Sequence, residues 1–257
     1  MDFFTLASSS SGNCAFAKSG DTAILIDAGI SAAKIEQTLA VQGERPDRIA
    51  AILLTHEHTD HIAGAARLAA RYGIPVYASP KTWSALSFAD DLPPSLKREF
   101  TYDMGLGEFR FEFCKTSHDA VQPLGLVLQA EGKRLGYVTD TGVVTRGMLY
   151  SLHDLDALVL EANHDRQMLM QGPYAPFLKR RVAGLSGHLA NSQAAELVVH
   201  LLQERLCPVM LAHLSETNNT PEAAYQTVAL ALQRLTAQPE EWLTVAPAHT
   251  PSCCWTL

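Results

Sequence analysis

The sequence predicts an α/β protein in which two β-sheets pack face to face and helices cover their outer surfaces. Three observations lead to this prediction. Short apolar runs alternate with helical segments in both halves of the chain, residues 3–27 have the pattern of strands separated by turns, and residues 49–54 are continuously apolar. Such a run is expected of a central strand covered on both faces. Since no low-complexity segment or long linker interrupts the pattern, residues 1–257 are predicted to form a single domain.

The first half of the chain opens with strand-like runs that turn-rich segments separate, at residues 3–7, 14–17 and 22–27. This spacing predicts an antiparallel opening. Ser31 is a suitable N-cap for a helix to about Gln42, because Ile35 and Leu39 lie four residues apart on one helical face. A second helix is predicted at residues 62–72, after the apolar strand.

The second half contains more apolar runs that predict strands, at residues 74–78, 109–114, 124–129, 135–139, 157–160 and 209–212. Helices fit residues 192–205 and 221–235. The last of these has Thr220 as its cap and Pro221 in its first turn.

The composition is that of an ordinary globular protein, with 47% hydrophobic and 18% charged residues. No apolar run approaches the roughly 20 residues that cross a bilayer. The N-terminus lacks a basic segment leading into an apolar one. Five cysteines without a C-x-x-C pair are predicted to be reduced thiols. We therefore expect a cytoplasmic protein that does not associate with membranes.

The net charge of −7 argues against a broad basic surface of the kind that binds nucleic acid through its phosphates. Bound cations would cancel part of an acidic cluster. A local basic patch is present in the run Lys179, Arg180 and Arg181. An ordinary solvated charge run remains the alternative interpretation of that patch.

Four candidate metal ligands stand within six residues directly after the apolar run at 49–54: His56, His58, Asp60 and His61. Open α/β sheets bind ligands at such strand ends. His56 and His58 can point to one cation, while Asp60 and His61 turn toward a second. Imidazole and carboxylate together suit zinc, manganese or iron, whereas an all-oxygen set would have suggested calcium or magnesium. The run predicts two neighbouring divalent ions, zinc or manganese, with iron as a further option.

One segment of six residues cannot complete two coordination shells, so further ligands must come from other strand ends. His118, Asp140 and His213 each follow an apolar run, as His56 does. We expect these three side chains to complete the centre.

The order H-x-H-x-D-H, His, Asp, His resembles the metallo-β-lactamase superfamily over nearly the whole chain. The resemblance implies an αββα four-layer sandwich of two mixed sheets flanked by helices. An oxidoreductase branch usually carries Glu at the position of His58, so His58 favours hydrolysis. The resemblance also implies two ligand sets and a bridging carboxylate: His56, His58 and His118; Asp60, His61 and His213; and Asp140.

Three segments resemble the branch that contains tRNA 3′-processing and β-CASP nucleases: residues 160–165, 186–191 and 211–215. In that branch the histidine matching His188 contacts the scissile phosphate and protonates the leaving oxygen, and the acid matching Glu161 orients it. This assignment is chemically reasonable, because a poor alkoxide leaving group needs a proton donor and histidine titrates near neutral pH. A carboxylate partner favours the imidazolium form.

Several short segments are similar to the YycJ/WalJ-like group of bacterial metallohydrolases: residues 9–14, 27–29, 118–120, 161–165, 187–189 and 218–219. That group is associated with 5′ to 3′ exonuclease activity on DNA. The resemblance therefore implies a metal-dependent phosphodiesterase, a 5′ to 3′ DNA exonuclease. Its expected nucleophile is a hydroxide shared by the two metals, which Asp60 would also orient.

The long clamp that tRNA-processing relatives use is absent, so tRNA is not the expected substrate. Contacts to DNA must come from loops of the core, or from a second subunit in a homodimer. The candidate contact residues are Asn13, His164 and Asn218. Backbone N–H groups of the loop at 8–13 can approach a phosphate, although a plain hairpin turn explains the loop equally well. His164 is placed near the metals by resemblance, and Asn218 either lines the cleft or begins the last helix.

Two other functions remain open. A small-molecule metallohydrolase, acting on a cyclic phosphodiester or a thioester, would use the same metals, and the acidic net charge favours it. A non-catalytic DNA-binding or regulatory protein would have the same fold without the catalytic activity. The complete set of ligands argues against this last interpretation.

Overall fold

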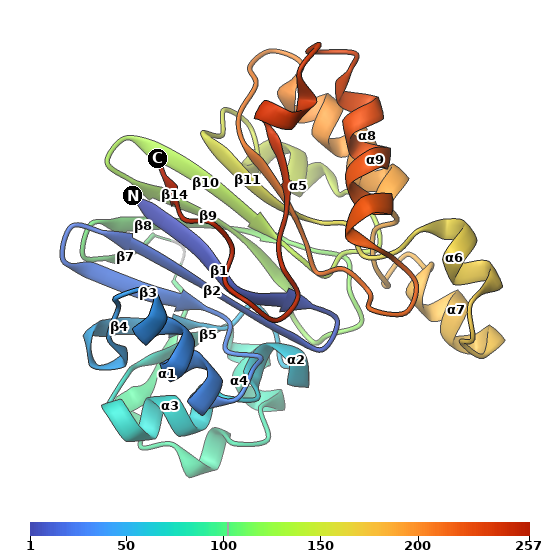
Figure 1. The fold of residues 1–257 in the computed structure, drawn as a ribbon. Coiled ribbons are helices and arrows are strands. Elements are labelled where there is room, and N and C mark those ends of the chain that lie inside the picture. Colours follow the sequence, from blue (N-terminus) through green and yellow to red (C-terminus); the bar gives the residue numbers. More distant parts are fainter. Residues whose placement is uncertain (102) are drawn as a thin grey trace.

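The computed structural model describes residues 1–101 and 103–257, and these form two seven-stranded β-sheets (Figure 1). The first sheet has the order β14 (Trp255–Thr256), β1 (Asp2–Ser9), β2 (Gly12–Ser19), β3 (Thr22–Ile26), β4 (Ile49–Leu53), β5 (Val76–Ala78) and β6 (Lys97–Glu99). The second has the order β13 (Leu243–Val245), β12 (Val209–Ala212), β11 (Ala157–Glu161), β10 (Lys133–Val138), β9 (Leu124–Ala130), β8 (Phe109–Lys115) and β7 (Met104–Leu106). Both sheets are mixed. The predicted antiparallel opening is confirmed, because β1, β2 and β3 pair antiparallel before β4 adds in parallel.

Helices cover the outer face of each sheet, as the alternation of strands and helices predicts (Figure 1). Outside the first sheet lie α1 (Ala32–Val41), α3 (Ala65–Tyr72) and α4 (Pro80–Ala85). Outside the second lie α5 (Arg146–Ser151), α8 (Asn191–Leu202) and α9 (Pro221–Leu232). One apolar cluster packs beneath each set of helices. The prediction of two facing sheets with helices outside is confirmed.

A third apolar cluster fills the space between the two sheets. The first sheet contributes Phe3, Ile24 and Leu53, and the second contributes Leu126 and Tyr137. These side chains are 2% exposed or less, and each sheet alone would leave its apolar inner face exposed to water. Our proposal that residues 1–257 form one domain rests on this shared core.

The helix predicted at residues 62–72 is confirmed as α3, which begins at Ala65, and a separate short helix, α2 (Thr59–Ile62), precedes it. The break lies at Gly64, whose N–H donates to the carbonyl of Ala28 at 2.8 Å. A Cβ atom at Gly64 would lie 2.3 Å from the carbonyl oxygen of Ile30. The loop after β3 therefore passes too close for a continuous helix, and Gly64 lies between α2 and α3.

The segment 166–182 was not assigned to any element from the sequence. It forms α6 (Arg166–Gln171) and α7 (Pro176–Val182), which we call the α6–α7 arm. In Figure 1 the arm projects beyond the second sheet, at the right of the view. Within the described part of the chain, no helix has the length and apolar character needed to span a membrane.

Candidate metal centre

The structure brings all seven predicted metal ligands together at one edge of the two sheets. They form overlapping groups in which the candidate ligand atoms lie within 4.8 Å of one another: His56, His58 and His118; Asp60, His61 and His213; and His56, His61 and Asp140. Each ligand lies in a segment that follows a strand, namely β4, β8, β10 or β12. The expectation drawn from strand ends thus agrees with their positions in the structure.

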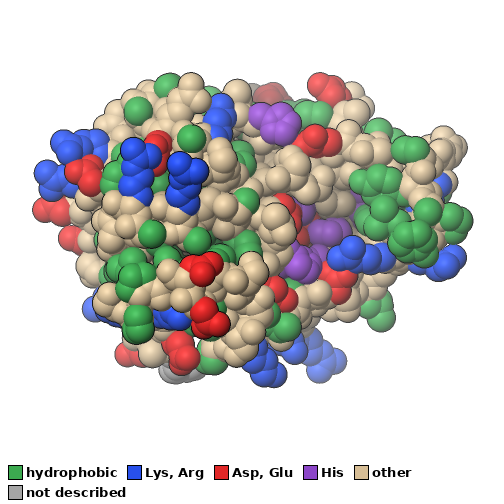
Figure 2. Space-filling view, turned by 90° about the horizontal axis from the view of Figure 1, so that it is seen from below, with side chains coloured by type: hydrophobic (Ala, Val, Ile, Leu, Met, Phe, Trp, Pro, Cys, Tyr) green, Lys and Arg blue, Asp and Glu red, His purple; other side chains and the backbone are tan. Residues whose placement is uncertain are grey.

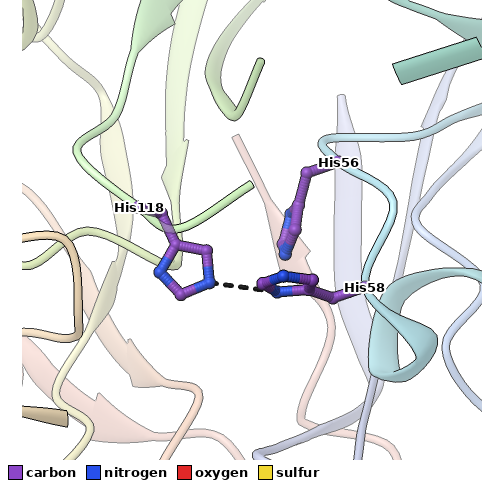
Figure 3. A group of neighbouring side chains, drawn as sticks. All are labelled: His56, His58 and His118. Atoms are coloured by element: carbon purple, nitrogen blue, oxygen red, sulfur yellow. Dashed lines mark hydrogen bonds between the residues drawn. The ribbon is translucent and has the colours of Figure 1, made fainter. Parts of the chain in front are cut away.

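The first group consists of three imidazole rings that converge on one point (Figure 3). His118 Nε2 lies 3.1 Å from His58 Nδ1, and His118 Nδ1–H donates to the carbonyl of Gly187 at 2.9 Å. Because that bond fixes the tautomer of His118, its Nε2 keeps a lone pair for a cation. His56 Nε2 is buried and has no hydrogen-bond partner among the described residues. Burial holds the pKa of His56 well below its ordinary value, so the ring stays neutral and can bind metal.

The second group contains Asp60, His61 and His213, and Asp140 lies between it and the first group. Asp140 Oδ2 is 3.1 Å from His61 Nε2, while Oδ1 is 3.4 Å from His213 Nε2 and 3.5 Å from His118 Nε2. One carboxylate therefore faces nitrogen atoms of both groups. Such a set of imidazoles with a shared carboxylate fits a pair of divalent transition-metal ions.

Asp27, to which the sequence assigned no role, contacts the candidate centre through His61. Its buried carboxylate accepts hydrogen bonds from Thr55 N at 2.8 Å, from Thr55 Oγ1 at 3.0 Å and from His61 Nδ1 at 2.7 Å. The proton on Nδ1 leaves His61 Nε2 directed at Asp60 and Asp140. Burial opposes a charge on this ring, but the carboxylates of Asp140 and Asp27 raise the pKa of His61 well above its ordinary value. The signal was present in the sequence, since Asp27 directly follows the buried strand β3.

Three residues at this edge have left-handed backbone conformations that non-glycine residues rarely adopt. Their φ angles are 58° at Asp27, 57° at Asp140 and 56° at His213. Each costs on the order of 1 kcal/mol relative to an ordinary conformation. The chain turns at each of these strand ends, and all three side chains belong to the candidate centre or contact it.

Next to the metal ligands lies the predicted catalytic pair, His188 and Glu161. His188 Nδ1 donates to Glu161 Oε1 at 2.7 Å, and Glu161 Oε2 accepts from the backbone N–H groups of Thr141 and Leu189, both at 3.0 Å. Burial opposes protonation of His188, but the charge and hydrogen bond of Glu161, followed by the charge of Asp140, raise its pKa to about 9. The ring is therefore held as an imidazolium at neutral pH.

The three predicted substrate contacts lie inside the protein. Asn13 is fully buried and donates to the carbonyl of Ser9 at 2.9 Å, and fully buried Asn218 lies 3.4 Å from Ser215 Oγ. His164 is 1% exposed, and burial lowers its pKa to about 4. In the described part of the chain none of the three lines the cavity, so a contact with substrate stays a prediction for them.

A cavity of about 350 Å³ is lined by His188 and by five of the candidate metal ligands, namely His58, Asp60, His118, Asp140 and His213. Its wall also contains Arg181, from the basic patch noted in the sequence, and Asp119, to which no role was assigned; their side chains form an ion pair at 2.6 Å. Asp119 Oδ1 also lies 3.4 Å from His118 Nε2, so this pair connects the α6–α7 arm to the metal centre. Figure 2 shows histidines in a hollow of the surface, with basic side chains at its rim.

Comparisons with known proteins agree with this architecture. Residues 22–209 match the family model of the β-lactamase superfamily domain. The exodeoxyribonuclease WalJ of Streptococcus pneumoniae serotype 2 is 38% identical over 228 residues, which cover 87% of this chain and 85% of that protein. The exodeoxyribonuclease YycJ of Bacillus anthracis is 35% identical over 239 residues, covering 91% and 89%.

Among solved structures, the metallo-β-lactamase fold protein YhfI from Bacillus subtilis superposes with a TM-score of 0.73 over 100% of both chains, at 15% identity. This likeness confirms the predicted αββα fold. The fold and the His/Asp groups together support the binding of divalent metal. With 35–38% identity over most of its length to the two exodeoxyribonucleases, the chain belongs to the metallo-β-lactamase superfamily, as a YycJ-like member.

Proposed function

We propose that this chain is a metal-dependent exodeoxyribonuclease that degrades DNA from the 5′ end toward the 3′ end. The observation that carries the proposal is the position of His188: this histidine, hydrogen-bonded to buried Glu161, lines the same cavity as five of the candidate metal ligands. Two relatives that match most of the chain are named exodeoxyribonucleases. Thioester cleavage would not need this proton donor, because a thiolate leaves without one.

The centre would hold two divalent ions, with zinc or manganese favoured by its imidazole and carboxylate donors. His56, His58 and His118 would bind one ion, Asp60, His61 and His213 the other, and Asp140 both. Bound there, the ions would neutralise charge on the phosphate and supply an activated water.

His188 would act on the leaving group. Its Nδ1–H is committed to Glu161, and no partner is recorded for Nε2 among the described residues. Nε2–H can therefore donate its proton to the departing 3′ oxygen as the P–O bond breaks. Glu161 would keep the ring charged and oriented, since its two oxygens are fixed by three hydrogen bonds. Asp60, which is partly exposed in the cavity, would orient the attacking water.

The test is a time course with single-stranded DNA labelled at either end, in zinc or manganese. We expect early release of labelled mononucleotide from the 5′ label and a ladder of shortening products from the 3′ label. The variant His188→Ala should keep its metal content, measured by mass spectrometry, and lose 10²- to 10⁴-fold in kcat. His153→Ala is the matched control, because His153 is exposed and does not line the cavity.

Three results would contradict the proposal. Early mononucleotide release from the 3′ label would reverse the polarity. Turnover of S-lactoylglutathione without any cleavage of DNA would assign the centre to thioesters. Binding of DNA by metal-loaded protein with every phosphodiester left intact would make the chain a regulatory protein.

A further inference from the structure

The α6–α7 arm forms one wall of the catalytic cavity. Tyr174, Leu178, Arg181 and Val182 line the cavity together with His188. Leu178 and Val182 lie four residues apart in α7, so one face of this helix turns toward the cavity, and Tyr174 reaches it from the bend before α7. The opposite face is open to solvent, with Phe177 67% exposed.

The arm differs in charge from the rest of the molecule. Residues 166–182 contain four cationic side chains and no Asp or Glu, in a chain whose net charge is −7. The cations are Arg166, Lys179, Arg180 and Arg181. Figure 2 shows hydrophobic and basic side chains gathered over the projecting part of the molecule, beside the histidines. A basic wall next to a metal centre attracts a polyanion to that centre.

Aromatic and arginine side chains occur in pairs along the arm. Tyr174 and Arg181 line the cavity, while Phe177 and Arg180 lie three residues apart on the exposed face of α7. Each nucleotide of a single strand presents one base and one phosphate, and a base stacks on an aromatic ring while a phosphate binds a guanidinium. Two such pairs, one inside the cavity and one at its rim, match successive nucleotides.

Arg181 is already oriented for this role. Its Nε–H is bonded to Asp119 Oδ2 at 2.6 Å, which fixes the plane of the guanidinium at the cavity wall. No bond is recorded for its two terminal nitrogens among the described residues, and these can donate to phosphate oxygens. Lys179 is used differently, because its Nζ donates to the carbonyl of Met170 at 2.7 Å and so joins α7 to α6.

We propose that the α6–α7 arm binds the single-stranded part of the DNA next to the scissile phosphate, with Tyr174 and Phe177 stacking on bases and Arg180 and Arg181 binding phosphates. The proposal rests on the proposed nuclease function and adds that the strand is unpaired where it contacts the arm, because bases within a duplex are already stacked and paired. A second copy of this chain is a less favourable binding partner for the arm than a DNA strand. A two-fold interface through the arm would oppose one set of four cations to another.

The test compares Phe177→Ala, Arg180→Ala and the double variant with wild-type protein on single-stranded oligonucleotides of increasing length. Both side chains are exposed, so the variants should fold. We expect KM of the wild type to fall as the strand grows long enough to reach the arm. Phe177→Ala should raise KM for long strands roughly 5- to 100-fold, more than it changes kcat. Arg180→Ala should reduce the slope of log affinity against log salt by about 0.7.

The matched control is an arginine–aromatic pair on another helix, Arg146 and Tyr150 of α5, both exposed and both outside the cavity. Arg146→Ala and Tyr150→Ala should leave KM, its length dependence and the salt slope unchanged. Equal KM values for wild type and arm variants would overturn the proposal while leaving the nuclease function intact. Failure of the wild type to cleave DNA of any length would overturn both. A variant that changes only from dimer to monomer in sedimentation, with unchanged KM, would assign the arm to a second copy of the chain.

Discussion

Replacing Asp27 with asparagine isolates the role of a buried carboxylate that touches no predicted substrate. Asparagine keeps the size of the side chain and tolerates the left-handed backbone at this position, where φ is 58°. With an oxygen in the position of Oδ1, it can still accept the bonds from Thr55 N and Thr55 Oγ1 that Asp27 Oδ1 accepts at 2.8 and 3.1 Å. Its amide nitrogen cannot accept the bond from His61 Nδ1–H that Asp27 accepts at 2.7 Å.

His61 must then lose this bond or move its proton to Nε2, the nitrogen directed at Asp60 and Asp140. Either change weakens a metal ligand. Loss of a hydrogen bond that orients a metal-binding histidine typically costs 10- to 100-fold in affinity. We therefore expect Asp27→Asn to lower the affinity for zinc by 10- to 100-fold, or about 1.4 to 2.7 kcal/mol.

The assay is a competition titration of metal-free protein against a chromogenic zinc chelator. Unfolding of the metal-free proteins, measured in parallel, separates a loss of affinity from a loss of folding. Asp154→Asn is the control, because the backbone at Asp154 is also left-handed, with a φ of 50°, but its side chain is exposed. Zinc affinity of Asp27→Asn within twofold of the wild type would refute the role that we assign to the Asp27–His61 bond.

Three further predictions concern stability. Removal of metal with a chelator should lower the melting temperature, since a ligand present at 1,000 times its Kd stabilises the folded state by about 4 kcal/mol; an unchanged calorimetric transition would contradict binding at this centre. Burial lowers the pKa of His164 from 6.5 to about 4, so only the unfolded chain takes up this proton as pH falls from 6.5 to 4. The free energy of unfolding should fall in that window by up to roughly 3 kcal/mol. His164→Asn should reduce the slope of this free energy against pH, measured by urea titrations at several pH values. A slope equal to that of the wild type would be inconsistent with a neutral buried ring. Gly29→Ala would place Cβ 1.7 Å from the carbonyl oxygen of Asp60 and should destabilise the fold by more than about 3 kcal/mol. Gly147→Ala is the control, because the nearest atom to its Cβ would lie 3.8 Å away. Equal denaturation midpoints for the two variants would show that the loop at Gly29 shifts without strain.

The metal ligands could be identified from the sequence because each depends on a local pattern. An apolar run followed within one to four residues by histidine or aspartate marks a strand end, and parallel strands bring such ends to one edge. His56, His118, Asp140 and His213 all follow this pattern. The central strands were located for the same reason, and β12 has the predicted bounds, Val209–Ala212.

Features that depend on contacts between distant segments could not be predicted in the same way. The helix break at Gly64 is caused by the loop after β3, more than 30 residues earlier. Strand β14 has only two residues and owes its conformation to pairing with β1. Helix α7 has seven residues, too few for periodicity to distinguish a helix from a loop. The partners of Asp119 and His188, 62 and 27 residues away, are likewise set by the tertiary fold.

The left-handed residues at the strand ends have a consequence for how this protein can change under selection. Glycine would adopt the backbone of Asp27, Asp140 or His213 with less strain, so a chain selected only for folding would favour glycine there. Polar side chains at these points represent a trade-off between stability and function. In a library screened for thermal tolerance without metal, glycine should therefore be enriched at positions 140 and 213, and the enriched proteins should be inactive.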